Sequence, residues 1–280
     1  MTKLRFILLF IILQTVAFGT HSQILLTGGE ALSEDSVTRD FSNQPYFGIY
    51  KDNYFIFGPS VGPKATKQNT NVKFQISIAQ RLTRSTLPWG TYLYLFYTQK
   101  CFWNILENSM PMTDLNFNPG IGITKPLFVK NRYIGKMTLM VEHESNGRDS
   151  IWSRSWNRVA LAANIMVTRN LMVHGKIWYP IVDGMNNKDI VNYCGFFQFG
   201  AQVLSNNKRF MGGITVVKHK GWNMNSNVIV DLAFRLFKKE NQYLYLQFYN
   251  GYGEGLLEYN KFHSQLRLGL LIKPKLFSDY

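Results

Sequence analysis

Apolar and polar residues alternate with a period of two along much of this chain. Residues 72–79 (VKFQISIA) and 227–236 (NVIVDLAFRL) place an apolar side chain at about every second position. Such alternation predicts β-strands with one apolar and one polar face. About twelve segments follow this pattern, and they start near Tyr46, Asn71, Gly90, Leu115, Tyr133, Trp156, Leu171, Cys194, Lys208, Ser226, Asn241 and His263.

The connections between these segments differ in length in a regular way. Long connections are expected at 58–70, 101–114, 146–155, 181–193 and 250–262, and short ones at 168–170, 205–207 and 238–240. Long external loops and tight periplasmic turns are typical of outer-membrane barrels. A soluble β-sandwich would also alternate, but even strand lengths and aromatic residues near strand ends argue against it. We therefore predict an all-β fold, a twelve-stranded antiparallel transmembrane β-barrel.

The first residues have the features of a secretory signal peptide. Lys3 and Arg5 precede an apolar run from Phe6 to Phe18, and small and polar residues follow. The run is too short to span a bilayer comfortably, and no other long uncharged apolar stretch follows it. We expect residues 1–22 to be a signal peptide and residues 23–280 to form a single barrel domain.

Composition and net charge limit the classes of binding partner that this protein is expected to have. Aromatic residues make up 15% of the chain and charged residues only 17%, which is low for a soluble surface. Without Lys3 and Arg5 the net charge is +12, which suits an anionic partner such as membrane head groups or lipopolysaccharide. Nucleic acid is the weakest candidate for an exported chain, and we expect no nucleic-acid partner. Cys101 and Cys194 could form a disulfide or remain free thiols.

The segment from His143 to Asn157 contains the residue types of a serine hydrolase. His143 lies two residues before Ser145, and Asn157 follows twelve residues later. These side chains could supply a general base, a nucleophile and a group that orients the base. Strand parity places all three on the apolar, lipid-facing side of two adjacent strands. Polar side chains are energetically unfavourable there, so their presence indicates a function. A lipid substrate is therefore expected.

Two alternatives remain open on the residues alone. A His-x-Ser pair is common, and these side chains could simply be polar groups at the rim of the barrel. An asparagine in place of the usual aspartate is compatible with catalysis, because asparagine orients the histidine in papain-like proteases.

Several motifs resemble those of the outer membrane phospholipase A family. They are HESNGR (143–148), SRSWNR (153–158), GYGE (251–254), EYN (258–260) and YTQ (97–99). The resemblance implies a twelve-stranded outer-membrane barrel, in agreement with the strand count. It also implies Ser145 as the nucleophile, His143 as the general base, Asn157 as the orienting residue and the Gly147 backbone N–H as an oxyanion donor.

The resemblance further implies a calcium cofactor and a homodimer. The matching calcium ligands are the Arg148 carbonyl and Ser153 of one chain, with Ser109 contributed by the other. Gln99 matches a polar residue that the family buries at the dimer contact. One position departs from the family pattern: Asn186 stands where the family has an acidic residue of a second calcium site, although Asp183 or Asp189 could substitute.

Together these features predict a calcium-dependent phospholipase A in a bacterial outer membrane, acting on phospholipids and lysophospholipids and activated by dimerisation. The competing hypotheses are a catalytically inactive porin-like or structural barrel and a soluble secreted esterase.

Overall fold

The computed structural model describes residues 46–273 apart from 84, 131, 222 and 238–239. The expected signal peptide, residues 1–22, lies outside this part. The strands are β1 (Phe47–Ile49), β2 (Asn53–Pro59), β3 (Thr70–Arg81), β4 (Tyr92–Trp103), β5 (Met112–Val129), β6 (Arg132–Ser145), β7 (Ser155–Met166), β8 (Leu171–Ile181), β9 (Phe197–Leu204), β10 (Phe210–Lys218), β11 (Ser226–Arg235), β12 (Gln242–Gly251) and β13 (His263–Ile272). The short helices are η2 (Pro88–Gly90), η3 (Ser150–Trp152) and α3 (Val191–Cys194).

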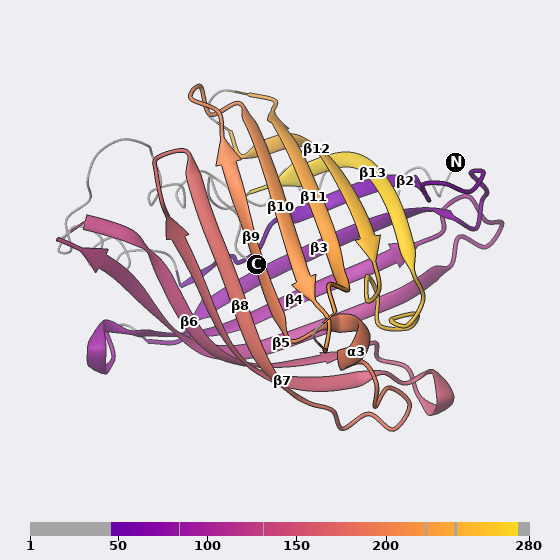
Figure 1. Cartoon of the computed structure of the whole chain (residues 1–280), viewed down its shortest axis with the longest axis horizontal. Helices are drawn as coiled ribbons and strands as arrows, with labels where there is room; N and C mark the ends of the chain where they lie inside the picture. The colour runs from indigo at the N-terminus through magenta and orange to yellow at the C-terminus, as the bar shows by residue number, and fades with distance from the viewer. Residues whose placement is uncertain (1–45, 84, 131, 222, 238–239, 274–280) are drawn as a thin grey trace.

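The strands form a closed antiparallel barrel with twelve strand positions, as the sequence predicted (Figure 1). Each strand from β2 to β13 pairs with its sequence neighbour, and β13 pairs back with β2. β1 and β2 share one position, because both pair with β3 in succession. Within residues 46–273, no helix is long and apolar enough to cross a membrane.

Side chains alternate between the two faces of the barrel wall as parity requires. On β6, Leu139 and Val141 are 47% and 51% exposed, whereas Glu142 between them and His143 is 4% exposed. On β7, Val159 and Leu161 are exposed, and Ala160 is buried. The outer surface is therefore apolar and the interior polar, which is the reverse of a soluble protein and suits a barrel in lipid.

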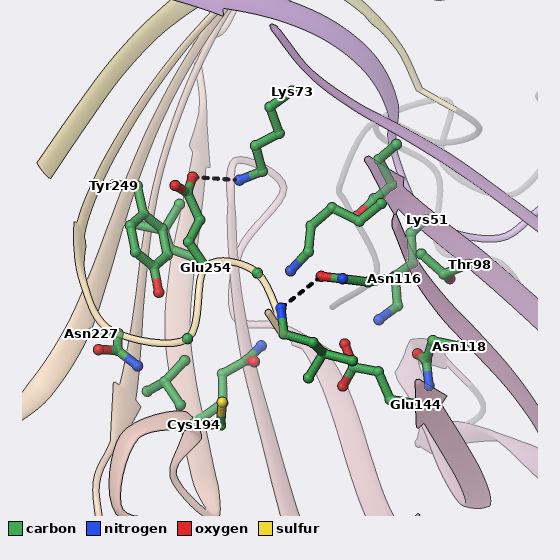
Figure 2. A pocket seen from close by; sticks show the side chains of 18 of the residues that line it. Lys51, Lys73, Thr98, Asn116, Asn118, Glu144, Cys194, Asn227, Tyr249 and Glu254 are labelled. Atoms are coloured by element: carbon green, nitrogen blue, oxygen red, sulfur yellow. Dashed lines mark hydrogen bonds and ion pairs between the residues drawn. The ribbon is translucent and has the colours of Figure 1, made fainter. Parts of the chain in front are cut away.

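Ion pairs and a folded loop occupy much of the interior. Glu254, in the β12–β13 connection, lies 2.6 Å from Arg267 and 3.1 Å from Lys73, and Figure 2 shows the Lys73 contact. In the same loop the backbone N–H of Leu256 donates to Asn116 Oδ1, 3.1 Å away, also visible in Figure 2. A cavity of about 260 Å³ remains among these groups. The loop that carries the GYGE motif thus folds into the mouth of the barrel.

A second group of charges lies behind the expected catalytic strands. Glu142 is 2.7 Å from Lys176 on β8, and Glu144 is 3.0 Å from Arg158 on β7. Arg158 also stacks over Trp156, 4.4 Å from the ring centroid. Because these partners come from three neighbouring strands, they fix how those strands align.

Six connections lie at one end of the barrel: 60–69, 104–111, 146–154, 182–196, 219–225 and 252–262. The connections at the other end are shorter, except for 82–91, which contains η2 and is as long as 60–69. The expected catalytic strand ends, at Ser145 and Ser155, open into the end that carries the six connections.

Candidate active site

His143 and Asn157 are direct partners across the β6–β7 ladder. Their side chains meet, with His143 Nδ1 2.8 Å from Asn157 Oδ1. A side-chain amide oxygen can only accept a hydrogen bond, so His143 must carry its proton on Nδ1. In the neutral imidazole, Nε2 then carries the lone pair, which is the tautomer that a general base at Nε2 requires.

Ser145 follows on the same outward face, at the end of β6. Its Cα is paired with Ser155 on β7 and with Phe117 on β5. Among the described residues no hydrogen bond joins Ser145 Oγ to His143. Contacts of this kind are often long without substrate and shorten in the complex. The structure therefore brings His143 and Asn157 together and places Ser145 beside them, with the hydroxyl contact not formed.

The loop 146–154 is organised by one buried amide. Asn146 is 3% exposed, and its Nδ2 donates to the Trp152 carbonyl at 2.8 Å. Its Oδ1 accepts from the backbone N–H groups of Arg148 and Arg154, at 3.4 and 3.0 Å. These three bonds cross-link the loop internally, so the loop is held by a side chain that the motif alone did not single out.

Gly147 has the backbone conformation that only glycine adopts readily. Its φ is +64°, and a Cβ at this position would meet the Phe117 ring at 2.8 Å. Gly147 lies in the loop 146–154, two residues after Ser145, the expected nucleophile. The conformation and the tight contact both disfavour a side chain at this position.

The expected calcium positions lie in exposed loops at the same end. Arg148 donates from Nη2 to the carbonyl of Thr113 on β5 at 2.7 Å, which directs its side chain towards that strand. Ser153 is half-buried at the end of η3, and Ser109 is exposed in the connection 104–111. A carbonyl and two hydroxyls are hard oxygen donors of the kind that calcium takes, so the residue types fit. The described residues contain no cluster of three or more His, Cys, Asp or Glu side chains arranged for a metal.

Asp183 contacts the expected site in a way that the sequence did not reveal. Its Oδ2 accepts from Asn157 Nδ2 at 2.9 Å, and its Oδ1 accepts from Ser155 Oγ at 3.4 Å. Asn187 is fully buried in the same loop and bonds the backbone N–H and carbonyl of Ser155, at 3.3 and 2.8 Å. No local pattern marks these residues, because the contacts depend on how the loop 182–190 folds back on β7.

The two cysteines do not pair: both are free. Cys101 is on β4 and Cys194 ends α3 in the β8–β9 connection. Burial, with a further effect from Glu144, raises the pKa of the Cys194 thiol to about 12. The thiol therefore stays protonated and is a poor nucleophile.

A family model described as Phospholipase A1 matches residues 45–272. The chain belongs to this family. It is 31% identical to the phospholipase A1 of Escherichia coli over 210 residues, covering 72% of this chain and 69% of that protein. It is 25% identical, over 76% of this chain and 58% of the relative, to a putative phospholipase A1 of Neisseria meningitidis.

Comparison with solved structures supports the same family. Outer membrane phospholipase A from E. coli matches with a TM-score of 0.74 and 25% identity, over 86% of this chain and 98% of that one. The same protein solved as an active-site mutant, with alanine in place of asparagine, matches with a TM-score of 0.73. The Salmonella typhi protein, solved as a dimer with bound calcium, matches with a TM-score of 0.72.

The predicted activity and location are thereby confirmed at the family level. The protein is a phospholipase A and a multi-pass protein of the outer membrane. The passive barrel and the soluble secreted esterase are both set aside.

Proposed function

We propose that this phospholipase A hydrolyses acyl esters of phospholipids and lysophospholipids with Ser145 as nucleophile, His143 as general base and Asn157 as the residue that orients the base. The observation that carries the proposal is the 2.8 Å contact between His143 Nδ1 and Asn157 Oδ1 on the lipid-facing side of the wall. This contact leaves Nε2 free to take the Ser145 proton. The hydroxyl oxygen then attacks the ester carbonyl, and the tetrahedral intermediate collapses with cleavage of the acyl C–O bond as His143 returns the proton to the leaving lysophospholipid or glycerophosphate hydroxyl. Water, activated by His143, later hydrolyses the acyl-enzyme to fatty acid and free Ser145.

Gly147 would supply a backbone N–H to the oxyanion of the tetrahedral intermediate. Its fixed positive φ keeps this amide in place before substrate binds, so no reorganisation is required during the reaction. Calcium held by the Arg148 carbonyl and Ser153, with Ser109 of a second copy, would add positive charge near the same oxygen. Support for calcium and for a dimer comes from the S. typhi relative, which was solved as a calcium-bound dimer.

Because the three side chains face outward, substrate would enter sideways from the outer leaflet and not through the barrel. Lipopolysaccharide is an expected neighbour of this positively charged chain, although the substrate of the reaction is phospholipid. Dimerisation would activate the enzyme, because the calcium site of each copy would be completed only by Ser109 of the other.

Ser145→Ala tests the nucleophile, with Ser226→Ala, a hydroxyl at the loop end of β11, as the matched control. We expect Ser145→Ala to abolish hydrolysis of phospholipid vesicles and labelling by a sulfonyl fluoride, whereas Ser226→Ala keeps both. Full hydrolysis by Ser145→Ala would reject the proposal.

Mixing two inactive variants tests the shared calcium site. Subunits with Ser109→Ala lack the donated ligand, and subunits with Ser145→Ala lack the nucleophile. If Ser109 acts across the interface, mixed dimers contain one intact site and recover up to about a quarter of wild-type activity. Asn108→Ala is the control for the loop. No recovery would place Ser109 and Ser145 in the same subunit's site, against the proposal.

A further inference from the structure

An apolar patch surrounds the loop side of the active site. The tip of the loop 146–154 exposes Ile151 and Trp152, by 68% and 55%. The next connection exposes Met185 by 84%. Asn186 Nδ2 donates to the Ser150 carbonyl at 2.8 Å, and this bond holds the two loops together. Ile151, Trp152 and Met185, here called the apolar tip, therefore come from two loops joined to each other.

The apolar tip continues the lipid-facing surface of the barrel. Below it on β8 are Tyr179 and Ile181, both exposed, and Ile181 is the direct ladder partner of Asn157. The catalytic pair thus lies within apolar surface instead of at its upper edge. Ser150, which directly precedes Ile151 and Trp152, adopts a φ of +51°. This backbone conformation is unfavourable for serine, so the backbone is strained where these two apolar side chains project.

We propose that the apolar tip inserts into the outer leaflet beside the active site and brings phospholipid to Ser145. A lipid surface is the occupant that the position favours. Tryptophan is enriched at membrane interfaces, and the patch is continuous with surface that already faces lipid. Gln99, the expected dimer contact within the membrane, is on β4, which lies on the side of β6 away from β8. A second copy that reaches Ser153 with its Ser109 would therefore approach from the β4 side and leave the β8 side of the tip to lipid.

Fluorescence quenching tests the insertion without reference to catalysis. Wild type and Trp152→Phe are reconstituted in vesicles with and without brominated phospholipid. We expect wild type to show a quenched component that Trp152→Phe lacks, at dilutions where the protein is monomeric. A Trp152 component quenched by aqueous acrylamide but not by bromolipid would overturn the proposal, as would lipid-independent shielding that appears only on dimerisation.

The kinetic consequence rests on the proposed function. Replacing Ile151 and Trp152 by serine should lower kcat/KM on phospholipid vesicles by about tenfold or more, given the apolar area lost from the lipid contact. Hydrolysis of a monomeric short-chain ester should not change. Met224→Ser, 90% exposed in the connection 219–225 at the same end, is the control and should affect neither. Equal losses on both substrates would show a structural role and reject insertion, whereas failure of the catalytic proposal is seen separately with Ser145→Ala.

A second inference follows from the hydrogen bonds of Asn157. We infer that Asp183 is a positioning residue that sets the orientation of the Asn157 amide. A carboxylate can only accept, so Asp183 requires the Asn157 NH₂ group to face it, at 2.9 Å. The amide oxygen is then turned to His143, which fixes the imidazole proton on Nδ1. The hydrogen-bonded series from Asp183 through Asn157 to His143 thereby places a carboxylate near a triad that has asparagine where aspartate is usual.

This inference rests on the proposed function, and a pH profile separates it from a structural role. The outward side chains that bear on His143 are Ser145 on its own strand, Asn157 on β7 and Asp183. From the interior side, Asn118 on β5 donates from Nδ2 to the His143 backbone carbonyl at 2.8 Å (Figure 2). Asp183 is the charged one among them. In Asp183→Asn, we expect kcat to fall about three- to tenfold with KM unchanged. The acidic limb of the kcat/KM profile should move to lower pH, because the imidazolium loses a nearby negative charge.

Asp183→Glu should recover part of the rate, and Glu258→Gln, an exposed carboxylate at the same end, should change nothing. A loss of rate with no movement of the acidic limb would overturn the inference. So would a raised calcium requirement without that movement, which would make Asp183 a metal ligand. If Ser145→Ala is inactive but Asp183→Asn is fully active, this inference alone fails.

Discussion

Gly147→Ala separates the oxyanion donor from the stability of its loop. An alanine at φ +64° costs about 1–2 kcal/mol, because its Cβ crowds the following carbonyl in the left-handed region. The added methyl would also lie 2.8 Å from the Phe117 ring, so either the ring or the loop must shift. Phe117 is only half-buried and can move, so the contact adds about 1 kcal/mol. We expect the free energy of unfolding to fall by about 2–3 kcal/mol.

The catalytic effect should be larger than the stability effect. If the loop shifts to relieve the strain, the Gly147 N–H leaves the oxyanion, and loss of one such donor lowers kcat by about 10²–10³. Both quantities can be measured on one preparation, with denaturant unfolding in lipid followed by tryptophan fluorescence and hydrolysis followed in mixed micelles at saturating calcium.

Gly90→Ala is a matched control. Gly90 has nearly the same φ, +68°, but lies in η2 at the opposite end of the barrel, and nothing lies within 4 Å of its added Cβ. It should lose only the backbone contribution of about 1–2 kcal/mol and keep its kcat. A folded Gly147→Ala enzyme whose kcat stays within about twofold of wild type would refute the oxyanion assignment.

Three further predictions concern the loop, the interior and the metal. Asn146→Ala removes all three cross-links of the loop 146–154 and should lower stability by about 1–3 kcal/mol and activity by at least about tenfold, whereas Asn146→Asp keeps the acceptor and should retain more of both. Burial opposes ionisation of Glu254, but Arg267 and Lys73 outweigh it and lower its pKa to about 2. A lowered folded-state pKa stabilises the fold above the unfolded value near 4.5, so the stability gap between wild type and Glu254→Gln should be full at pH 7 and close as the pH falls from about 4.5 towards 2; a gap independent of pH would contradict the assignment. Chelation should abolish hydrolysis, and calcium but not magnesium should restore it, since magnesium demands a stricter geometry; equal rescue by magnesium would argue against the proposed ligands.

Strand positions and faces were predictable because they depend on local alternation. The parity of β6 alone placed His143 and Ser145 outward and Glu142 inward, and the structure agrees. The break between β1 and β2 was not predictable, since residues 50–52 show no distinct pattern and the break is visible only from pairing with β3.

Loop contacts were not predictable for a different physical reason. Asn146, Asp183 and Asn187 are short polar residues in connections, where such residues ordinarily face water. Each contributes here through a contact that exists only after a loop has folded, and two of them join segments about thirty residues apart. The motifs pointed to the residues proposed to perform the chemistry, but they gave no sign of the loop residues that contact them.

The register of β6 on β7 connects the interior of the barrel to the catalytic surface. The same ladder that pairs His143 with Asn157 pairs Glu142 with Arg158 one step away. Because side chains alternate, a slip of one residue would turn the ion pair towards lipid and the catalytic pair into the lumen. The ion pairs among Glu142, Glu144, Arg158 and Lys176 oppose such a slip, since a charged side chain facing lipid is strongly unfavourable. The charged interior therefore does more than fill the barrel: it fixes which residues of β6 and β7 meet on the outside, and so helps to bring the proposed catalytic pair together.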